Sequence, residues 1–150
     1  MKINEYEILI VSPFDREYLV AEITRGDDFF AELNQEKGFL EIQLYGNKNA
    51  ILHVALKEFC DVLNRAKEYL SPSNICSDIL KNDGDFKFEQ GGNGYFLYYR
   101  KTKIATAYVL GDQKELDIIY GMNGYLLLPF DSFINVLKKI GKMLSGISLV

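Results

Sequence analysis

The sequence predicts an α+β fold in which an antiparallel β-meander followed by one helix occurs twice in tandem (ββββα repeated). Two observations support this prediction. The segment "EFCDVLNRAK" at 58–67 places its apolar side chains at the same helical positions as "SFINVLKKIG" at 132–141. Short runs of alternating apolar and polar residues, separated by turn residues, precede each of these helices. We expect each amphipathic helix to cover the apolar face of a sheet.

The first half contains five strand-like runs and one helix. A β-rich run from Glu5 to Val11 is closed by Pro13, and "EYLVAEI" then alternates in the manner of a half-buried strand. The turn residues 25–28 join it to "FFAEL", whose alternation places Phe29 on the apolar face and Phe30 on the opposite face. The expected strands are 5–11, 17–23, 29–33, 39–45 and 50–54, and the expected helix is 56–70.

Pro72 ends the first helix, because proline cannot continue it, and a second series of strands then begins at Phe86. The expected strands are 86–90, 95–100, 104–110, 115–120 and 125–129, and the expected helix is 131–144. We therefore expect one α+β domain over 1–150, built from two similar halves, 1–72 and 84–150, joined by a short linker or helix at 73–83. Whether the halves share one sheet or form two is left open by the sequence.

The two halves do not align at a single spacing. The alignment of the helices matches Phe59 with Phe133 and would match Tyr45 with Ile119, whereas the Tyr-Gly pairs match Tyr45 with Tyr120, one position further along. Because a slip of one residue turns a strand over, we expect a small insertion or a bulge between the halves.

Charge is distributed unevenly along a chain whose net charge is −4. Residues 1–41 carry ten acids and four bases, whereas the remainder carries 11 acids and 13 bases. This balance argues against nucleic-acid binding, which requires a basic stripe. The acids either favour a basic protein partner or only keep the protein soluble. No apolar run reaches the roughly 20 residues of a membrane helix, and the acidic start of the sequence does not resemble a signal peptide. A cytoplasmic location is expected.

The residues that most often carry chemistry form no catalytic or metal-binding motif. Cys60 and Cys76 lack ligand spacing and are expected to be buried apolar residues. The single histidine, His53, is expected to be structural, because no second histidine accompanies it and no nucleophile motif is present. The "GGNG" at 91–94 precedes a strand, so it is interpreted as a hairpin turn and not as a phosphate loop. The sequence thus predicts no catalytic residues, no cofactor and no metal.

Aromatic residues are abundant, with ten Tyr and ten Phe but no Trp. In "YFLYYR" at 95–100 both faces of the predicted strand are aromatic, which leaves two interpretations open. The strand either packs against its neighbours or presents Tyr98 and Arg100 to a partner, because Tyr and Arg are enriched at protein interfaces.

The segments "YLVAEI", "FFAELNQE" and "EFCDVL" resemble the immunity proteins of bacterial contact-dependent growth inhibition (polymorphic toxin) systems. The resemblance covers roughly the segment 1–70. It implies a protein that is not an enzyme and that binds and neutralises a cognate toxin domain, often a nuclease, by occluding its active site. The partner-binding residues expected on charge and interface composition are Glu22, Asp27, Asp28, Glu32, Glu36, Tyr98 and Arg100.

A second class of function is also compatible with the sequence. An acidic secretion chaperone would form a homodimer and bind an extended protein segment by strand addition. An immunity protein, in contrast, can be a monomer until it meets its toxin.

Overall fold

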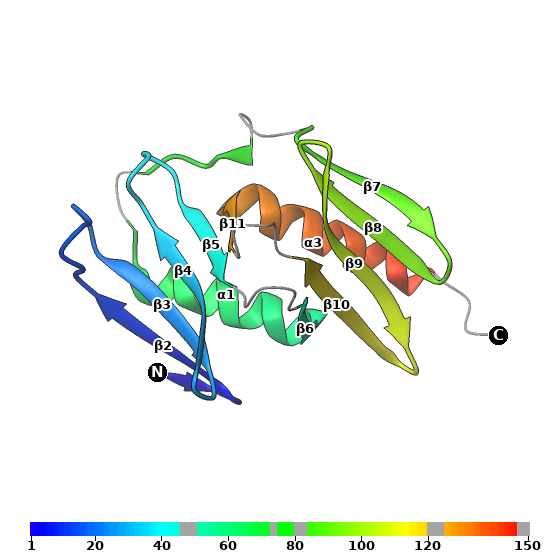
Figure 1. The fold of residues 1–150 in the computed structure, drawn as a ribbon, viewed down its shortest axis with the longest axis horizontal. Coiled ribbons are helices and arrows are strands. Elements are labelled where there is room, and N and C mark those ends of the chain that lie inside the picture. The colour runs from blue at the N-terminus through cyan, green and yellow to red at the C-terminus, as the bar shows by residue number, and fades with distance from the viewer. Residues whose placement is uncertain (46–50, 73–74, 80–83, 120–124, 147–150) are drawn as a thin grey trace.

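The computed structural model describes residues 1–45, 51–72, 75–79, 84–119 and 125–146, and within these ranges it contains two antiparallel sheets and two helices (Figure 1). The predicted α+β class is therefore confirmed. The strands are β1 (Lys2–Ile3), β2 (Tyr6–Val11), β3 (Val20–Arg25), β4 (Asp28–Asn34), β5 (Glu41–Tyr45), β6 (Ile51–Ala55), β7 (Phe86–Gly91), β8 (Gly94–Tyr99), β9 (Thr102–Leu110), β10 (Gln113–Ile119) and β11 (Tyr125–Pro129). The helices are α1 (Leu56–Leu70) and α3 (Phe130–Ser145).

Each sheet takes one strand from the other half of the chain. The first sheet has the order β1-β2-β3-β4-β5-β11, and the second has the order β6-β10-β9-β8-β7. The chain crosses to the second sheet between β5 and β6, and it returns to the first between β10 and β11. Two sheets are therefore present, but neither is a meander contained in one half. Alternation in the sequence predicts which face of a strand is apolar and does not predict its neighbour.

Residues that pair in the first sheet have counterparts that pair in the second. The counterparts are separated along the chain by the same number of residues as Phe59 and Phe133 of the two helices. Ala21 lies opposite Leu33 in the first sheet, and Tyr95 lies opposite Ala107 in the second. A register shift follows Ile23 in the first sheet and Leu97 in the second. The residues that suggested the longer spacing, Gly46, Tyr120 and Gly121, lie outside the described residues. The main difference in length lies between the first two long strands of each half, where residues 12–19 join β2 to β3 and residues 92–93 join β7 to β8.

The register shift after Ile23 overturns the predicted orientation of two phenylalanines. Phe30 is buried, with its ring centroid 5.4 Å from that of Tyr6, whereas Phe29 is 40% exposed on the opposite face of the sheet. Simple alternation predicted the reverse. The irregularity lets Phe30 and Ala31 both face the core, because a bulge interrupts the alternation of side chains along a strand.

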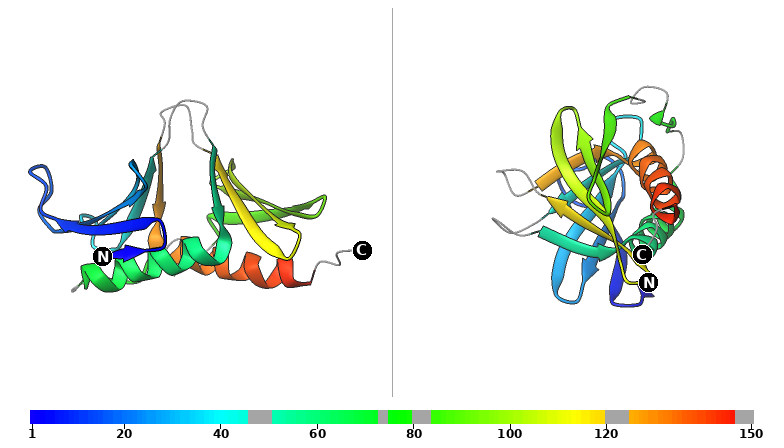
Figure 2. Two further views of the ribbon diagram at one scale, coloured as in Figure 1. Left: turned by 90° about the horizontal axis from the view of Figure 1, so that it is seen from below. Right: turned by 90° about the vertical axis from the view of Figure 1, so that its right-hand side faces the viewer.

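Both helices lie on the same side of the two sheets (Figure 2). Helix α1 contacts β2 and β3 of the first sheet as well as β6 and β10 of the second, and α3 contacts β9 and β11. Phe59 of α1 is fully buried between them, with its ring centroid 6.4 Å from that of Phe30 and 6.3 Å from that of Phe133 on α3. The buried apolar residues of both sheets and both helices form one continuous core.

The described part of the linker, residues 75–79, runs alongside the first sheet. Cys76 forms an isolated parallel bridge with Phe39, and its amide donates a hydrogen bond to the Gly38 carbonyl oxygen at 2.9 Å. Of the linker or helix expected at 73–83, the described residues 75–78 are not helical, whereas Ile79 is. Within the described residues, neither helix is long and apolar enough to cross a membrane.

The two cysteines differ in exposure, which corrects the expectation that both are buried. Cys60 is half-buried on α1, whereas Cys76 is exposed in the linker. Burial, together with the nearby charge of Asp61, raises the pKa of the Cys60 thiol to about 11. At pH 8 only about one Cys60 side chain in a thousand is then a thiolate, the reactive form.

We expect this difference to be visible in a thiol titration. With a chromogenic disulfide reagent at pH 8, one thiol per folded chain should react rapidly and the second at least about tenfold more slowly. Cys76→Ser should remove the rapid phase, and Cys60→Ser should leave it in place. Equal rates for the two thiols in the folded protein would contradict the assignment, and the unfolded chain provides the control in which both thiols react.

Candidate functional site

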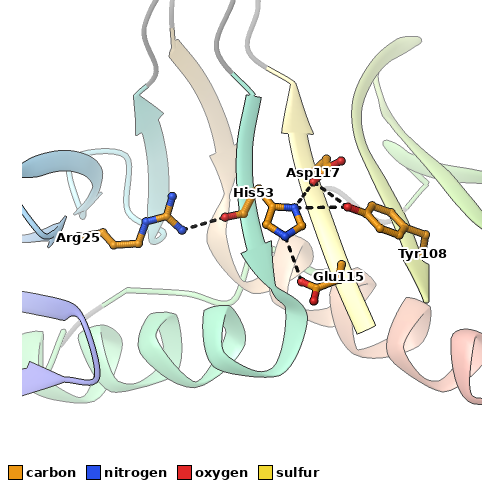
Figure 3. Close-up of polar contacts among 5 residues, drawn as sticks. All are labelled: Arg25, His53, Tyr108, Glu115 and Asp117. Atoms are coloured by element: carbon orange, nitrogen blue, oxygen red, sulfur yellow. Dashed lines mark hydrogen bonds and ion pairs between the residues drawn. The ribbon is translucent and has the colours of Figure 1, made fainter. Parts of the chain in front are cut away.

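A group of polar side chains lies on the face of the second sheet that points away from the helices (Figure 3). His53 on β6 faces Asp117 on β10, its direct cross-strand neighbour, and Nδ1 of the imidazole lies 2.5 Å from Oδ1 of the carboxylate. Its Nε2 lies 3.4 Å from Oε2 of Glu115. Leu52 and Val54, the neighbours of His53 along the strand, are buried, so alternation turns the imidazole outward.

Tyr108 on β9 completes this cluster. Its hydroxyl donates a hydrogen bond to Oδ1 of Asp117 at 3.3 Å and lies the same distance from Nδ1 of His53. Burial raises the pKa of Tyr108, and so do the Asp117 charge, the hydrogen bond to it and the Glu115 charge. The hydroxyl therefore remains protonated at neutral pH and can continue to donate.

The geometry favours a structural role for His53. Both imidazole nitrogens face carboxylates, so the ring bridges β6 and β10. The Arg25 guanidinium donates a 2.8 Å hydrogen bond to the His53 carbonyl oxygen, which links the first sheet to β6 (Figure 3). Among the described residues, no group of three or more His, Cys, Asp or Glu side chains is arranged to hold a metal ion.

A second buried polar group, Asp78, also has a structural explanation. Its carboxylate accepts hydrogen bonds from the amides of Asp131 and Ser132, at 3.0 and 2.7 Å, and from the Ser132 hydroxyl. These amides lie in the first turn of α3, where Pro129 provides no side-chain cap. Asp78 thus caps α3 from a distant part of the chain, and the negative charge also suits the helix dipole.

The outer face of the first sheet, which we call the acidic face, has a different character. On this face, exposed apolar or aromatic side chains lie beside carboxylates on neighbouring strands, as cross-strand register and burial show. Its members on the strands include Glu7, Leu9, Glu22, Thr24, Phe29, Glu32, Gln43, Tyr45, Tyr125 and Leu127. Leu9, Phe29 and Tyr125 are 46%, 40% and 42% exposed, and exposed apolar side chains gathered on one face are a common mark of an interaction surface. The face therefore combines apolar anchors with negative charge.

The connection 12–19 contacts the acidic face through Arg16 and Glu32, and it carries exposed apolar side chains of its own. Arg16 donates to Glu32 Oε2 at 3.0 Å, and the amides of Glu17 and Tyr18 donate to Glu36 Oε1 at 2.9 and 3.1 Å. Phe14 projects from this connection and is fully exposed. Burial raises the pKa of the neighbouring Tyr45, and the Glu32 charge raises it further.

The structure separates the seven residues predicted to bind a partner into three groups. Glu22 lies on the acidic face, and Asp27 and Asp28 lie at the adjoining β3–β4 turn. Glu32 lies on the same face, directly opposite Glu22, but it is bonded to Arg16 and is only 8% exposed. Glu36 accepts hydrogen bonds from the amides of the connection 12–19. Tyr98 and Arg100 lie on the second sheet.

The exposure of Leu9, Phe14, Phe29 and Tyr125 was not predicted from the sequence. Phe14 directly follows Pro13, which closes the first predicted strand, so it is the one that the sequence could have indicated. The exposure of Phe29 depends on the register shift, and that of Tyr125 on a strand that crosses between sheets. Comparison of the chain with protein-family models, curated proteins and solved structures found no match.

Proposed function

We propose that this protein is a cytoplasmic immunity protein that binds a basic toxin domain through the acidic face and blocks the toxin's active site. The observation that carries the proposal is the combination of exposed Leu9, Phe29 and Tyr125 with carboxylates on one sheet, beside the exposed Phe14 of the connection 12–19. The resemblance of the segment 1–70 to immunity proteins supports the same assignment.

The chemistry of the acidic face suits a high-affinity interface. Stable protein complexes bury about 1,600 Å² in total, and a few central aromatic or apolar anchors provide most of the binding energy. Leu9, Phe29 and Tyr125 lie on the strands, where the sheet holds them in place before binding. A rigid face of this kind loses little conformational entropy on association.

The acids on and beside this face would act mainly on the rate of association. Exposed charges of one sign accelerate encounter with an oppositely charged partner, and salt screens the effect. Because Glu32 and Glu36 are held by intramolecular contacts, we assign the steering to Glu22, Asp27 and Asp28. The partner is expected to be basic around its active site, as a nuclease is.

The direct test is genetic and biochemical. Native co-purification from the source cell should recover a protein that is toxic when it is expressed alone and harmless when it is co-expressed with this chain. Recovery of partners that are harmless in both settings would contradict the proposal. The purified pair should form a one-to-one complex, and the toxin's active site should be inaccessible to substrate within it.

Charge reversal tests the steering role. The triple variant Glu22→Lys, Asp27→Lys, Asp28→Lys should associate with the captured toxin at least about tenfold more slowly at low salt, and its rate should depend less on ionic strength. The matched control, Asp61→Lys, Glu68→Lys, Asp112→Lys, changes net charge equally at exposed positions away from the acidic face. Stopped-flow association rates between 20 and 300 mM salt provide the measurement, and equal effects of the two triple variants would contradict steering by the acidic face.

We also infer that the two halves derive from one strand-and-helix unit that was used twice. The same spacing along the chain relates the strand pairs of the first half to those of the second, one register shift to the other, and α1 to α3. This shared spacing supports the inference. On this basis each position of the acidic face has a counterpart on the second sheet, where a different binding property can evolve.

A further inference from the structure

The outer edge of the second sheet contains a hollow of about 550 Å³. Side chains from β7, from β8 and from the turn that follows β8 line it, among them Lys87, Phe88, Glu89, Tyr98, Arg100 and Lys101. The hollow thus combines two aromatic rings with three cationic side chains. It lies on the opposite sheet from the acidic face, so the two surfaces can be occupied independently.

The turn between β8 and β9 has a backbone conformation that its residues do not favour. Tyr99 pairs with Thr102, so Arg100 and Lys101 form a two-residue turn, and both have positive φ, 48° and 72°. Two-residue turns of this kind strongly favour Asn-Gly, because residues with a Cβ atom are strained at positive φ. Two basic residues in these positions suggest that the side chains are kept for a purpose other than stability.

The corresponding turn of the first sheet provides a contrast. There Gly26 and Asp27 form the turn between β3 and β4, and a glycine occupies the left-handed position. The left-handed backbone therefore recurs in both turns, and only the second turn places a residue with a Cβ atom in it. Equivalent turns of the two sheets carry opposite charge, acidic in the first and basic in the second.

The charges around the hollow favour an anionic occupant. Of the two acids that line it, Asp85 is paired with Arg100, with Nε and Oδ2 3.3 Å apart, whereas Glu89 has no ion-pair partner among the described residues. Lys87 and Lys101 are exposed, and Arg100 keeps 65% of its side chain exposed despite the contact with Asp85. Lys103 adds a fourth cation nearby, held 3.9 Å above the Phe96 ring. Of the charged side chains that line the hollow itself, three are cations and two are acids, so a small positive excess remains.

The geometry of β7 favours an extended occupant. Among the described residues, no strand pairs with the outer edge of β7, so one row of its backbone amides and carbonyls remains free for another strand. A single lysine on an edge strand is enough to discourage unwanted pairing, and Lys87 satisfies that need. Arg100 and Lys101 add positive charge that protection of the edge does not require.

We propose that this hollow binds an acidic, extended polypeptide segment, which adds to β7 as a further strand and places its carboxylates near Lys87, Arg100 and Lys101. Backbone pairing would supply affinity, and the cations would select acidic side chains at alternate positions. This inference does not depend on toxin binding by the acidic face.

The probe for this site is a fluorescein-labelled octapeptide that alternates glutamate and valine. We expect fluorescence anisotropy to detect saturable one-to-one binding at 50 mM salt, at least tenfold weaker at 300 mM salt, and at least tenfold weaker for a peptide with lysine in place of glutamate. An oligothymidylate of eight nucleotides serves as a competitor. Displacement by this oligonucleotide at equal concentration would indicate general anion binding and would overturn the proposal.

The double variant Arg100→Asn, Lys101→Gly separates function from stability. It introduces the preferred turn residues, so its melting temperature should rise by roughly 3 to 6 °C, whereas its affinity for the glutamate peptide should fall at least tenfold. A loss of affinity cannot then be attributed to unfolding. The control Lys57→Asn, Lys142→Gly removes two lysines from the helices and should leave peptide binding unchanged. Unchanged affinity of the turn variant, or an equal loss in the control, would overturn the proposal.

Discussion

Replacing Phe59 with alanine is expected to lower the free energy of unfolding by about 3–5 kcal/mol, the cost usual for a fully buried phenylalanine. The side chain lies where α1 meets Phe30 of the first sheet and Phe133 of α3. Removing the ring leaves a cavity that rigid neighbours on three elements cannot easily fill. Urea unfolding followed by circular dichroism provides the measurement.

The exposed Phe14 supplies the matched control, because Phe14→Ala deletes the same kind of ring at a solvent-exposed position. It should change the unfolding free energy by less than about 0.5 kcal/mol. The Phe59→Ala variant should still unfold in one transition. The strands that cross between sheets, β6 and β11, prevent either half from unfolding while the other remains intact. Two separate transitions in the variant would contradict this view of the domain.

Local features of the fold could be predicted from sequence with good accuracy. Helix α1 occupies Leu56–Leu70, the range predicted from the spacing of Phe59 and Val62, and β11 occupies the predicted 125–129. Both predictions rest on periodicity, which is a property of neighbouring residues. The pairing of β11 with β5 depends on contacts between distant segments, and the alternation of residues does not predict such contacts.

The candidate surfaces show the same difference between local features, which the sequence predicts, and long-range contacts, which it does not. Composition identified an acidic first part of the chain, and acids do gather around the first sheet. Composition could not separate Glu22, which lies on the open face, from Glu32, whose charge is paired with Arg16 and largely buried. It also missed the exposure of Phe29, since a single register shift exchanges the environments of Phe29 and Phe30.

The second large effect on stability is expected in the glycine-rich segment "GGNG" at 91–94. Sequence interpretation gave it one role, a hairpin turn, and Gly92 has the positive φ of 57° that such a turn requires. Gly94 has a different reason to be glycine: a Cβ atom there would lie 2.0 Å from the Ala107 carbonyl oxygen and 2.9 Å from Cα of Tyr108. Gly94 belongs to β8, which is paired on both sides, with β7 and with β9.

Gly94→Ala should therefore destabilise the protein by about 3 kcal/mol or more, because the backbone of β8 or β9 must move away and its hydrogen bonds must lengthen. Gly92→Ala is the matched control, since open space surrounds that position and only the positive φ is unfavourable. Its expected cost is about 1 kcal/mol. Differential scanning calorimetry of the two variants should rank them in this order, with Gly94→Ala also losing protection from hydrogen exchange in β8 and β9. If Gly92→Ala proved the more destabilising, the close approach of β8 to β9 would not be the reason for this glycine.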